Sequence, residues 1–251
     1  MKKYEVSFVY ASFDEGKDMY DGGPIEFNIE AECKEDAFEN AYVGALETDA
    51  VDQIVDMTIT CKETGEKYTL DDVEAYLDEK EENRIKRLKD RKEKSYEKYK
   101  NSNKILELKN IFEKTLKDFK NDVENIIKEF NADLLIENFC AYIDEKHLIE
   151  KYDNASTDNL KLHIALQFCD SMYAQLSDED YFESNIAIEI GTLMQYLEDK
   201  LTIKEYKYLK DKVADQIPLK MQYSKIIEIL EKGKKVDFRK IGGMGREIFI
   251  L

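Results

Sequence analysis

The segment 76–100, YLDEKEENRIKRLKDRKEKSYEKYK, contains neither glycine nor proline and sorts its side chains by position. At 100° per residue, its acidic, basic and sparse apolar residues fall on three separate faces of a helix. The basic face is formed by Lys80, Arg84, Arg87, Arg91, Lys94 and Lys98. A disordered charged tract has no reason to separate its charges in this way. The segment therefore predicts a stiff helix, about 45 Å long over 71–100, that acts as a strut between two folded parts.

The start of this helix is well marked, and its end allows two alternatives. Thr69 is a good N-cap residue, and Asp71 and Asp72 suit the positive end of a helix dipole. After NSN at 101–103, an apolar seam predicts further helix as far as residue 130. The chain either turns back at NSN into an αα-hairpin or continues as one helix. We favour the hairpin, because Asn and Ser favour turns and the two arms have similar length.

The apolar seam of the second arm is wider than the sparse apolar stripe of the first arm can cover. Either a second copy of the chain or the C-terminal region must therefore cover the remainder. A homodimer through this seam is one expectation, with contacts at Ile105, Phe112, Leu116, Phe119, Val123 and Phe130.

The first 70 residues alternate between apolar and polar side chains, which is typical of strands with one buried face. Strands are predicted at 4–10, 25–33 and 55–61, with a short fourth strand after the turn KETGEK, and a helix is predicted at 34–47. This order indicates a small ββαββ domain whose helix covers the apolar face of the sheet. Its outward-facing positions include Glu26, Glu30, Glu32 and Asp56.

Residues 131–251 contain five successive amphipathic segments, which predict a helical domain. Thr202 and Glu205 form a capping box, Pro218 suits a first helical turn, and Gly233 suits a helix end. The last residues, VDFRKIGGMGREIFIL, predict two short strands around GGMG. The predicted fold class is therefore α+β and predominantly helical. It comprises an acidic α+β domain at 1–70, a helical arm at 71–130, and a C-terminal helical domain at 131–251 that ends in a short β-hairpin.

The net charge of −17 is concentrated in the N-terminal third. Residues 1–77 carry 20 acidic and 6 basic side chains, whereas residues 78–130 carry 13 and 16. Neutralisation of phosphates supplies most of the non-specific affinity of proteins for nucleic acid. We therefore expect no direct binding of nucleic acid.

No run of 18 apolar residues and no signal peptide is present, so we expect neither a membrane span nor export. The four cysteines, Cys33, Cys61, Cys140 and Cys169, are widely spaced and include no Cys-x-x-Cys pair. This spacing is typical of buried thiols in a reducing compartment. We expect a cytoplasmic protein.

We identify no catalytic, cofactor-binding or metal-binding residue in the sequence. Cys140, Asp144 and His147 fall on one face of a predicted helix. A spacing of seven residues, however, separates the thiol from the imidazole by about 10 Å along the axis, too far for a hydrogen bond. We interpret these residues as an ordinary helix face with an ion pair, and His163 as a structural residue in an apolar helix.

Two other patterns fail as ligand-binding motifs. The acidic loop with Asp14, Glu15, Asp18 and Asp21 lacks the glycine and the final glutamate of a calcium-binding loop. GGMG at 242–245 precedes a strand and not a helix, so it predicts a hairpin turn and no phosphate site. We expect no cofactor.

The charge distribution favours a non-enzymatic binding protein that sets an acidic surface against a basic, nucleic-acid-handling protein. Inhibitors or regulators from phages and mobile elements, of the anti-defence or immunity type, belong to this class. The expected contact residues are Glu26, Glu30, Glu32 and Asp56 on the sheet and Arg84, Arg87 and Arg91 on the helix. The alternatives are a dimeric coiled-coil scaffold and an enzyme with an unrecognised site made of carboxylates alone.

Overall fold

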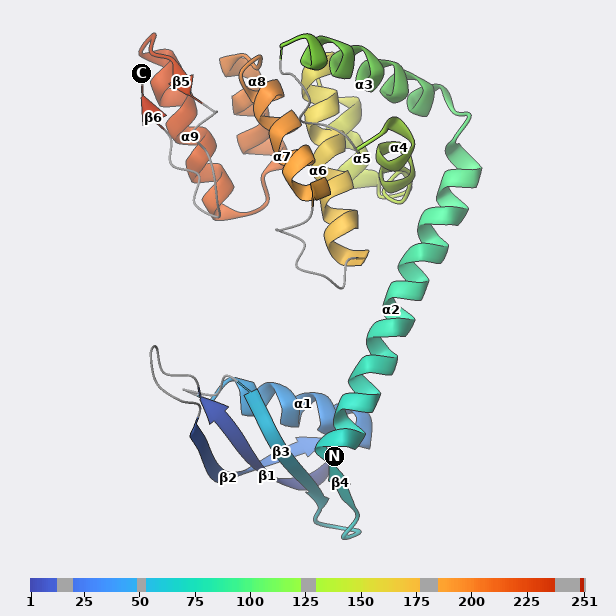
Figure 1. The fold of residues 1–251 in the computed structure, drawn as a ribbon, viewed down its shortest axis with the longest axis vertical. Helices are drawn as coiled ribbons and strands as arrows, with labels where there is room; N and C mark the ends of the chain where they lie inside the picture. Colours follow the sequence, from blue (N-terminus) through green and yellow to red (C-terminus); the bar gives the residue numbers. More distant parts are fainter. Residues whose placement is uncertain (13–19, 49–52, 123–129, 177–184, 238–248, 251) are drawn as a thin grey trace. The chain divides into compact units, whose positions relative to one another are not determined.

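The fold of the chain is α+β and mostly helical (Figure 1). The structure is a computed structural model that describes residues 1–12, 20–48, 53–122, 130–176, 185–237 and 249–250. The described contacts divide the chain into two compact units, Met1–Lys86 and Arg87–Leu251. The division falls inside the long helix α2, Leu70–Tyr99, and each unit has a hydrophobic core of its own.

The first unit contains a four-stranded antiparallel sheet with the order β2-β1-β3-β4. Its elements are β1 Lys2–Ser12, β2 Tyr20–Ala31, α1 Lys34–Leu46, β3 Gln53–Cys61 and β4 Lys67–Thr69. The predicted ββαββ order and the predicted helix at 34–47 are confirmed. Period-two alternation identified these strands because one face of the sheet is buried and the other is not.

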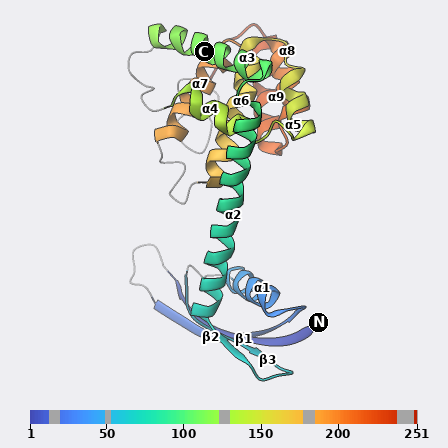
Figure 2. The same ribbon diagram turned by 90° about the vertical axis from the view of Figure 1, so that its right-hand side faces the viewer.

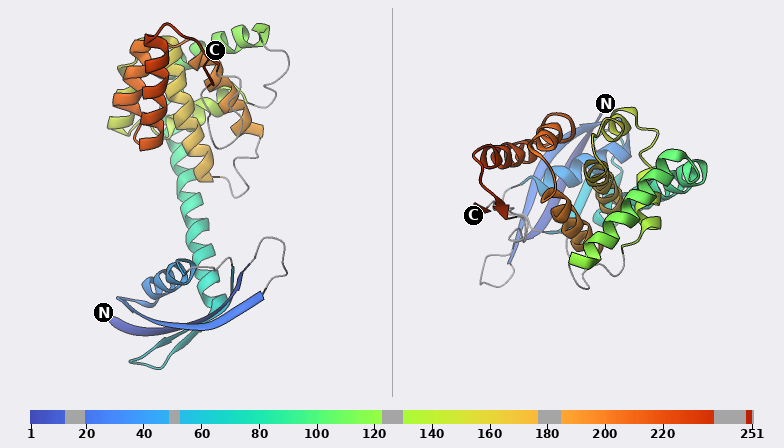
Figure 3. Two further views of the ribbon diagram at one scale, coloured as in Figure 1. Left: turned by 90° about the vertical axis from the view of Figure 1, so that its left-hand side faces the viewer. Right: turned by 90° about the horizontal axis from the view of Figure 1, so that it is seen from above.

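The apolar face of the sheet packs against α1. Tyr4, Val6 and Phe8 of the central strand β1 are buried on this face, and their partners across β2 and β3 are apolar as well. The buried residues of α1 include Ala37 and Ala41, whose small side chains allow the helix to lie close to the strands. Figure 2 and the left view of Figure 3 show α1 and the start of α2 on the same side of the sheet.

The first turns of α2 belong to the core of the first unit. Val73 is fully buried there, and Glu39 of α1 accepts hydrogen bonds from the Tyr76 hydroxyl at 2.8 Å and the Lys80 ammonium at 2.5 Å. These bonds lower the pKa of Glu39, with Lys80 the larger contributor, and raise the pKa of Tyr76 to about 12. The helix prediction for 76–100 is confirmed, since α2 runs without interruption for 30 residues.

The second unit is a helical domain built around α6. Its elements are α3 Asn103–Asp122, α4 Ala132–Cys140, α5 Lys146–Asp153, α6 Asp158–Leu176, α7 Asn185–Glu198, α8 Ile203–Tyr208, a π-helical turn Leu209–Val213, α9 Ile217–Glu231, β5 Val236–Asp237 and β6 Phe249–Ile250. Helix α6 packs against α3, α4, α5 and α7. It is therefore buried on more than one face, whereas the amphipathic pattern predicted for 157–176 would bury only one.

The predicted αα-hairpin is wrong. The chain does leave the helix near NSN, but α3 packs on α4 and α6 instead of returning along α2 (Figure 1). The apolar seam of α3 has many large side chains. It removes more apolar surface from water against α4 and α6 than it would against the sparse apolar stripe of α2. One predicted helix is also divided in two, because α4 ends at Cys140 and α5 begins at Lys146.

The predicted C-terminal β-hairpin is not seen among the described residues. Two strands of two residues each, β5 and β6, pair in antiparallel fashion, with Val236 opposite Ile250. The residues that would form the connecting turn, including GGMG at 242–245, lie outside the described ranges.

The helix-end signals in the second unit behave as predicted. Thr202 and Glu205 form a full capping box, in which the Thr202 N–H donates to the Glu205 carboxylate at 2.7 Å. Pro218 lies in the first turn of α9. Gly233 has a φ of 70° and closes α9 with the hydrogen bond from the Lys234 N–H to the Ile229 carbonyl, at 3.2 Å.

Candidate functional site

The face of the sheet opposite α1 is uncovered within the described part of the first unit. The register places on this face the residues that alternate with the buried ones, which are Lys3, Glu5, Ser7, Val9, Glu26, Asn28, Glu30, Asp56, Thr58, Thr60, Lys67 and Thr69. We call these twelve residues the open face. Its carboxylates come from three adjacent strands, and Ser7, Thr58 and Thr60 lie between them. A mostly polar and acidic sheet surface of this kind suits contact with a protein, and its described residues form no enclosed site for a small molecule.

The carboxylates of the open face are weakly neutralised by their neighbours. Glu30 lies opposite Lys3 in the register, and the ammonium is 3.9 Å from the carboxylate, with both side chains more than half exposed. An exposed ion pair of this kind contributes about 0–1 kcal/mol. Within the described residues, Glu5, Glu26 and Asp56 have no ion pair, and all three are exposed. The open face thus carries a negative potential directed away from the core.

Glu32, which the sequence placed with these carboxylates, lies outside the strand. The end of the strand gives the reason: β2 ends at Ala31, and Glu32 follows in the bend before α1. Glu32 is exposed beside the sheet, so Glu5 takes its place on the open face. The sequence contained the signal for Glu5, because it alternates with Tyr4 and Val6 in the same strand.

The basic face of α2 is mostly engaged within each unit. In the first unit Lys80 pairs with Glu39, and Arg84 pairs with Glu81. In the second unit Lys98 lies 3.4 Å from Asp144. Of the three predicted contact arginines, Arg87 alone is exposed without an ion pair among the described residues. Most of the described basic residues of this face thus form ion pairs within their own unit, so the face is not a continuous, unpaired basic surface.

Arg91 has a structural task in the second unit. Its guanidinium donates to the Ala141 carbonyl at 2.5 Å, pairs with Glu145, and lies 5.5 Å from the centre of the Tyr142 ring. These three residues lie in the turn 141–145 between α4 and α5. Arg91 thus satisfies a carbonyl at the C-terminal end of α4, where helices leave such groups unpaired.

Cys140, Asp144 and His147 do not form a reactive group. Cys140 is buried at the end of α4, while His147 is exposed in α5. Asp144 forms its ion pair with Lys98 and accepts a hydrogen bond from the Tyr99 hydroxyl, and these contacts, the Tyr99 bond first, lower its pKa. The ion pair predicted on this face is not seen among the described residues, because Asp144 pairs with Lys98 of α2 and not with His147.

The buried thiols of Cys140 and Cys169 are unsuited to nucleophilic chemistry. Burial raises the pKa of Cys140 and of Cys169 to about 12. The thiolate, which is the nucleophilic form, is therefore not populated at neutral pH. Cys169 accepts a hydrogen bond from the Asn138 side chain at 3.3 Å inside the core.

His163 lies in the core of the second unit, as its apolar helix predicted. It is fully buried in α6, and its Nε2 lies 3.2 Å from the Glu198 carboxylate at the end of α7. Glu189 and Glu205 are buried as well, where they accept hydrogen bonds from the Phe130 N–H at 2.5 Å and the Thr202 N–H at 2.7 Å. The capping box predicted the contact of Glu205 with Thr202 but not the burial of Glu205, and no local pattern distinguished Glu189 from an exposed glutamate.

The seam predicted for a dimer lies inside a single chain. Ile105, Phe112, Phe119 and Phe130 are each at most 3% exposed and belong to the core of the second unit. Leu116 is partly buried against the same core, and Val123 lies outside the described residues. A dimer through the four buried side chains would require them to leave that core. The dimer itself stays a prediction.

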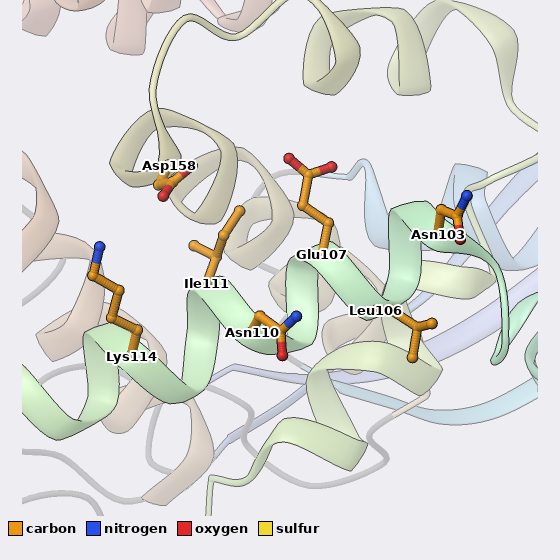
Figure 4. Close-up of a pocket in the computed structure, with 7 residues that line it drawn as sticks. All are labelled: Asn103, Leu106, Glu107, Asn110, Ile111, Lys114 and Asp158. Atoms are coloured by element: carbon orange, nitrogen blue, oxygen red, sulfur yellow. The ribbon is translucent and has the colours of Figure 1, made fainter.

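A shallow groove runs along α3, lined by Asn103, Leu106, Glu107, Asn110, Ile111 and Lys114 of α3 and Asp158 of α6 (Figure 4). Its volume is about 440 Å³. Glu107 already pairs with Lys161 at 2.6 Å. The lining combines both charges with apolar side chains and shows no convergent set of groups for one ligand.

Within the described ranges, no cluster of three or more His, Cys, Asp or Glu side chains could hold a metal ion. The acidic loop with Asp14, Glu15, Asp18 and Asp21 lies largely outside those ranges. The described helices include none with the length and apolar character needed to cross a bilayer. No protein-family model, curated protein or solved structure matches the chain.

Proposed function

We propose that the protein binds another protein through the open face of its N-terminal sheet and acts as an inhibitor or regulator, without catalysis of its own. The observation that carries the proposal is the set of four carboxylates, Glu5, Glu26, Glu30 and Asp56, on an exposed sheet face with one ion pair among them. The chemistry of this face calls for a partner with a basic surface.

Charge supports a nucleic-acid-handling protein as that partner. Proteins that bind nucleic acid carry basic patches, and opposite potentials accelerate association and exclude wrong partners. The first 77 residues hold 20 acidic and 6 basic side chains, so their repulsion of phosphate opposes direct binding of nucleic acid. Anti-defence and immunity proteins of phages and mobile elements act in this way, and we place the protein in that class.

The two alternative functions have less support. A dimeric scaffold would use the seam of α3, which is buried in the chain's own core. An enzyme with a carboxylate-only site would need converging acidic groups. The open-face carboxylates are spread over three strands, and adjacent strands are about 4.8 Å apart, so the described residues do not bring these groups together in one cleft.

The test is affinity capture from host extract over a series of salt concentrations, with two matched triple variants. The first variant, Glu26→Lys, Glu30→Lys and Asp56→Lys, reverses the open face. The second, Glu79→Lys, Glu82→Lys and Asp90→Lys, makes the same change in net charge on exposed positions of α2.

We expect the wild-type protein and the α2 variant to retain a basic partner that salt displaces, and the open-face variant to lose it. Capture of the same partner by the open-face variant, or capture that is indifferent to salt, would refute the proposal. Circular dichroism of each variant checks that the sheet is retained.

A further inference from the structure

Strand β2 forms one edge of the sheet and leaves half of its backbone groups without a strand partner in the described structure. It pairs with β1 on one side, and the order β2-β1-β3-β4 places no strand on its other side. Its segment Ile25–Ala31 pairs regularly with β1. An edge of this length is a template for another strand unless it is blocked.

Two hydrogen bonds reveal which residues of β2 direct their backbone toward the free edge. The Cys61 N–H donates to the Glu66 carbonyl beside β4, and the next N–H, that of Lys62, donates to the Lys3 carbonyl of β1, both at 2.9 Å. In an antiparallel sheet, the N–H and C=O of one residue point to the same side, and successive residues alternate. Since the backbone N–H and C=O of Lys3 point toward β3, those of Tyr4 point toward β2.

The register then carries this orientation into β2. Tyr4 lies opposite Ile29, so the N–H and C=O of Ile29 point toward β1. By alternation, the backbone groups of Glu26, Asn28 and Glu30 point toward the free edge. These are the residues of β2 whose side chains lie on the open face. Backbone donors and acceptors therefore occur together with two carboxylates along one edge.

The pattern of side chains along this edge specifies the strand that would fit it. Ile25, Phe27 and Ile29 alternate with the open-face residues, are partly buried, and pack against the core. A neighbouring strand must therefore place apolar residues on the core side. On the open face, cations directly opposite Glu26 and Glu30 would form favourable cross-strand pairs. Because these glutamates are four residues apart, the cations would be about 13 Å apart.

Strand β1, which already pairs with the other side of β2, has the same pattern of apolar and basic residues in part. It presents apolar residues opposite the apolar residues of β2, and it presents Lys3 opposite Glu30, with the ammonium 3.9 Å from the carboxylate. Opposite Glu26, however, it presents Ser7, which carries no charge to neutralise that carboxylate. A second strand with the same alternation and an added cation would match the free edge more completely than β1 does.

We propose that the free edge of β2 binds its partner by strand addition and takes a segment in which apolar and basic residues alternate. This inference rests on the proposed function and defines the bound element of the partner. Main-chain hydrogen bonds provide affinity in this mode of binding, and the alternating side chains provide specificity.

A second copy of the chain fits this edge less well than a basic strand does. An antiparallel pairing of two β2 strands centred on Asn28 would set Glu26 of each copy opposite Glu30 of the other, which brings like charges together. A pairing centred on Glu26 would oppose the two Glu26 carboxylates. Self-association is therefore an outcome that would contradict the proposal.

The experiment measures amide hydrogen exchange by NMR in the full chain, with a nine-residue peptide of alternating lysine and valine as the probe. The control peptide has the same composition with its lysines contiguous. The alternating peptide is expected to slow exchange of the Glu26, Asn28 and Glu30 amides at least tenfold. The Phe27 and Ile29 amides, which already donate to β1, should change little. Equal slowing by both peptides, no slowing at millimolar peptide, or protection of the outward amides without peptide would overturn the proposal.

A matched pair of variants separates this inference from the proposed function. Asn28→Pro removes an N–H that points to the free edge and no hydrogen bond to β1, and proline is tolerated at such edge positions. We expect Asn28→Pro to weaken binding of the alternating peptide and of the captured partner at least tenfold, while Asn28→Ala retains both.

Full capture by a folded Asn28→Pro chain, together with loss of capture on reversal of the open-face charges, would refute strand addition and leave the proposed function intact. Capture that resists both salt and charge reversal would refute the proposed function itself. If Asn28→Pro does not fold, as judged by circular dichroism, the exchange measurement on the wild-type chain decides the matter.

Discussion

Two glycines of the second unit differ in backbone conformation, because Gly191 is helical and Gly233 has a positive φ. Substitution by alanine should therefore change the free energy of unfolding in opposite directions at the two positions. Gly191 lies within α7, and nothing lies within 4 Å of the position a Cβ would take. Gly191→Ala should therefore raise the free energy of unfolding by about 0.5–1 kcal/mol, because alanine loses less entropy in a helix. Gly233 has a φ of 70°, which alanine adopts only with strain, so Gly233→Ala should lower the free energy of unfolding by about 1 kcal/mol. Urea denaturation measures both changes, and equal signs would contradict this assignment.

The buried carboxylate of Glu205 should make the stability of the second unit depend on pH in the acid range. Burial alone would raise the pKa of Glu205, but hydrogen bonds from Thr157 and from the hydroxyl and N–H of Thr202 outweigh it and hold the pKa below its ordinary value of 4.5. The stabilisation is complete above that ordinary value and is lost as the pH falls through the lower, folded-state pKa.

We therefore expect Glu205→Gln to lower the midpoint of thermal unfolding at pH 7, and expect the difference from wild type to shrink below about pH 4.5. Calorimetry between pH 7 and pH 3 measures this difference. A constant difference across that range would show that the charge of Glu205 does not contribute.

At the scale of elements, two arginines of α2 provide a direct comparison. Arg91 donates to the Ala141 carbonyl and pairs with Glu145, whereas Arg87 is exposed, four residues earlier on the same face. Arg91→Ala should reduce the free energy of unfolding of the second unit by about 1–3 kcal/mol, because a buried carbonyl loses a charged donor. Arg87→Ala should change it by less than about 0.5 kcal/mol. Equal effects in urea denaturation would contradict the anchoring role of Arg91.

The same contact explains what could and could not be predicted from the sequence. The strands, α1 and α2 were predictable, because their periodicity and capping residues are local. The break between Cys140 and Lys146 was not, since it contains neither glycine nor proline and is stabilised by Arg91, some 50 residues earlier. The direction of α3 was equally hidden, because it depends on which helices offer the larger apolar surface.

At the scale of the whole molecule, the apolar seam of α3 serves the core of its own chain. Phe112 is 1% exposed and packs edge-to-face on Phe130, with ring centroids 5.5 Å apart. Phe112→Ala should therefore cost about 3–5 kcal/mol of stability and leave the molar mass in solution unchanged. Light scattering and urea denaturation together measure this. A change in molar mass without loss of stability would identify the seam as an interface between two copies.

The candidate surface was partly visible in the sequence. Glu26, Glu30 and Asp56 were predictable as outward-facing, because strand alternation fixes the face of each side chain. That Glu32 lies off the open face could not be predicted, because this depends on where β2 ends. The free edge of β2 could not be predicted either, because it depends on the strand order, which no local pattern encodes. Arg91 and Lys98, predicted as parts of one basic face, have partners far along the chain that only the fold brings near.

The central claim is that the open face of the sheet attracts a basic partner, and the association rate constant tests it most directly. Stopped-flow or surface-plasmon measurements with the captured partner should show a rate that falls at least tenfold between about 20 mM and 500 mM salt. In the variant carrying Glu26→Lys, Glu30→Lys and Asp56→Lys, the rate at low salt should be reduced by a similar factor and should lose this salt dependence. A rate that salt and charge reversal leave unchanged would contradict the claim.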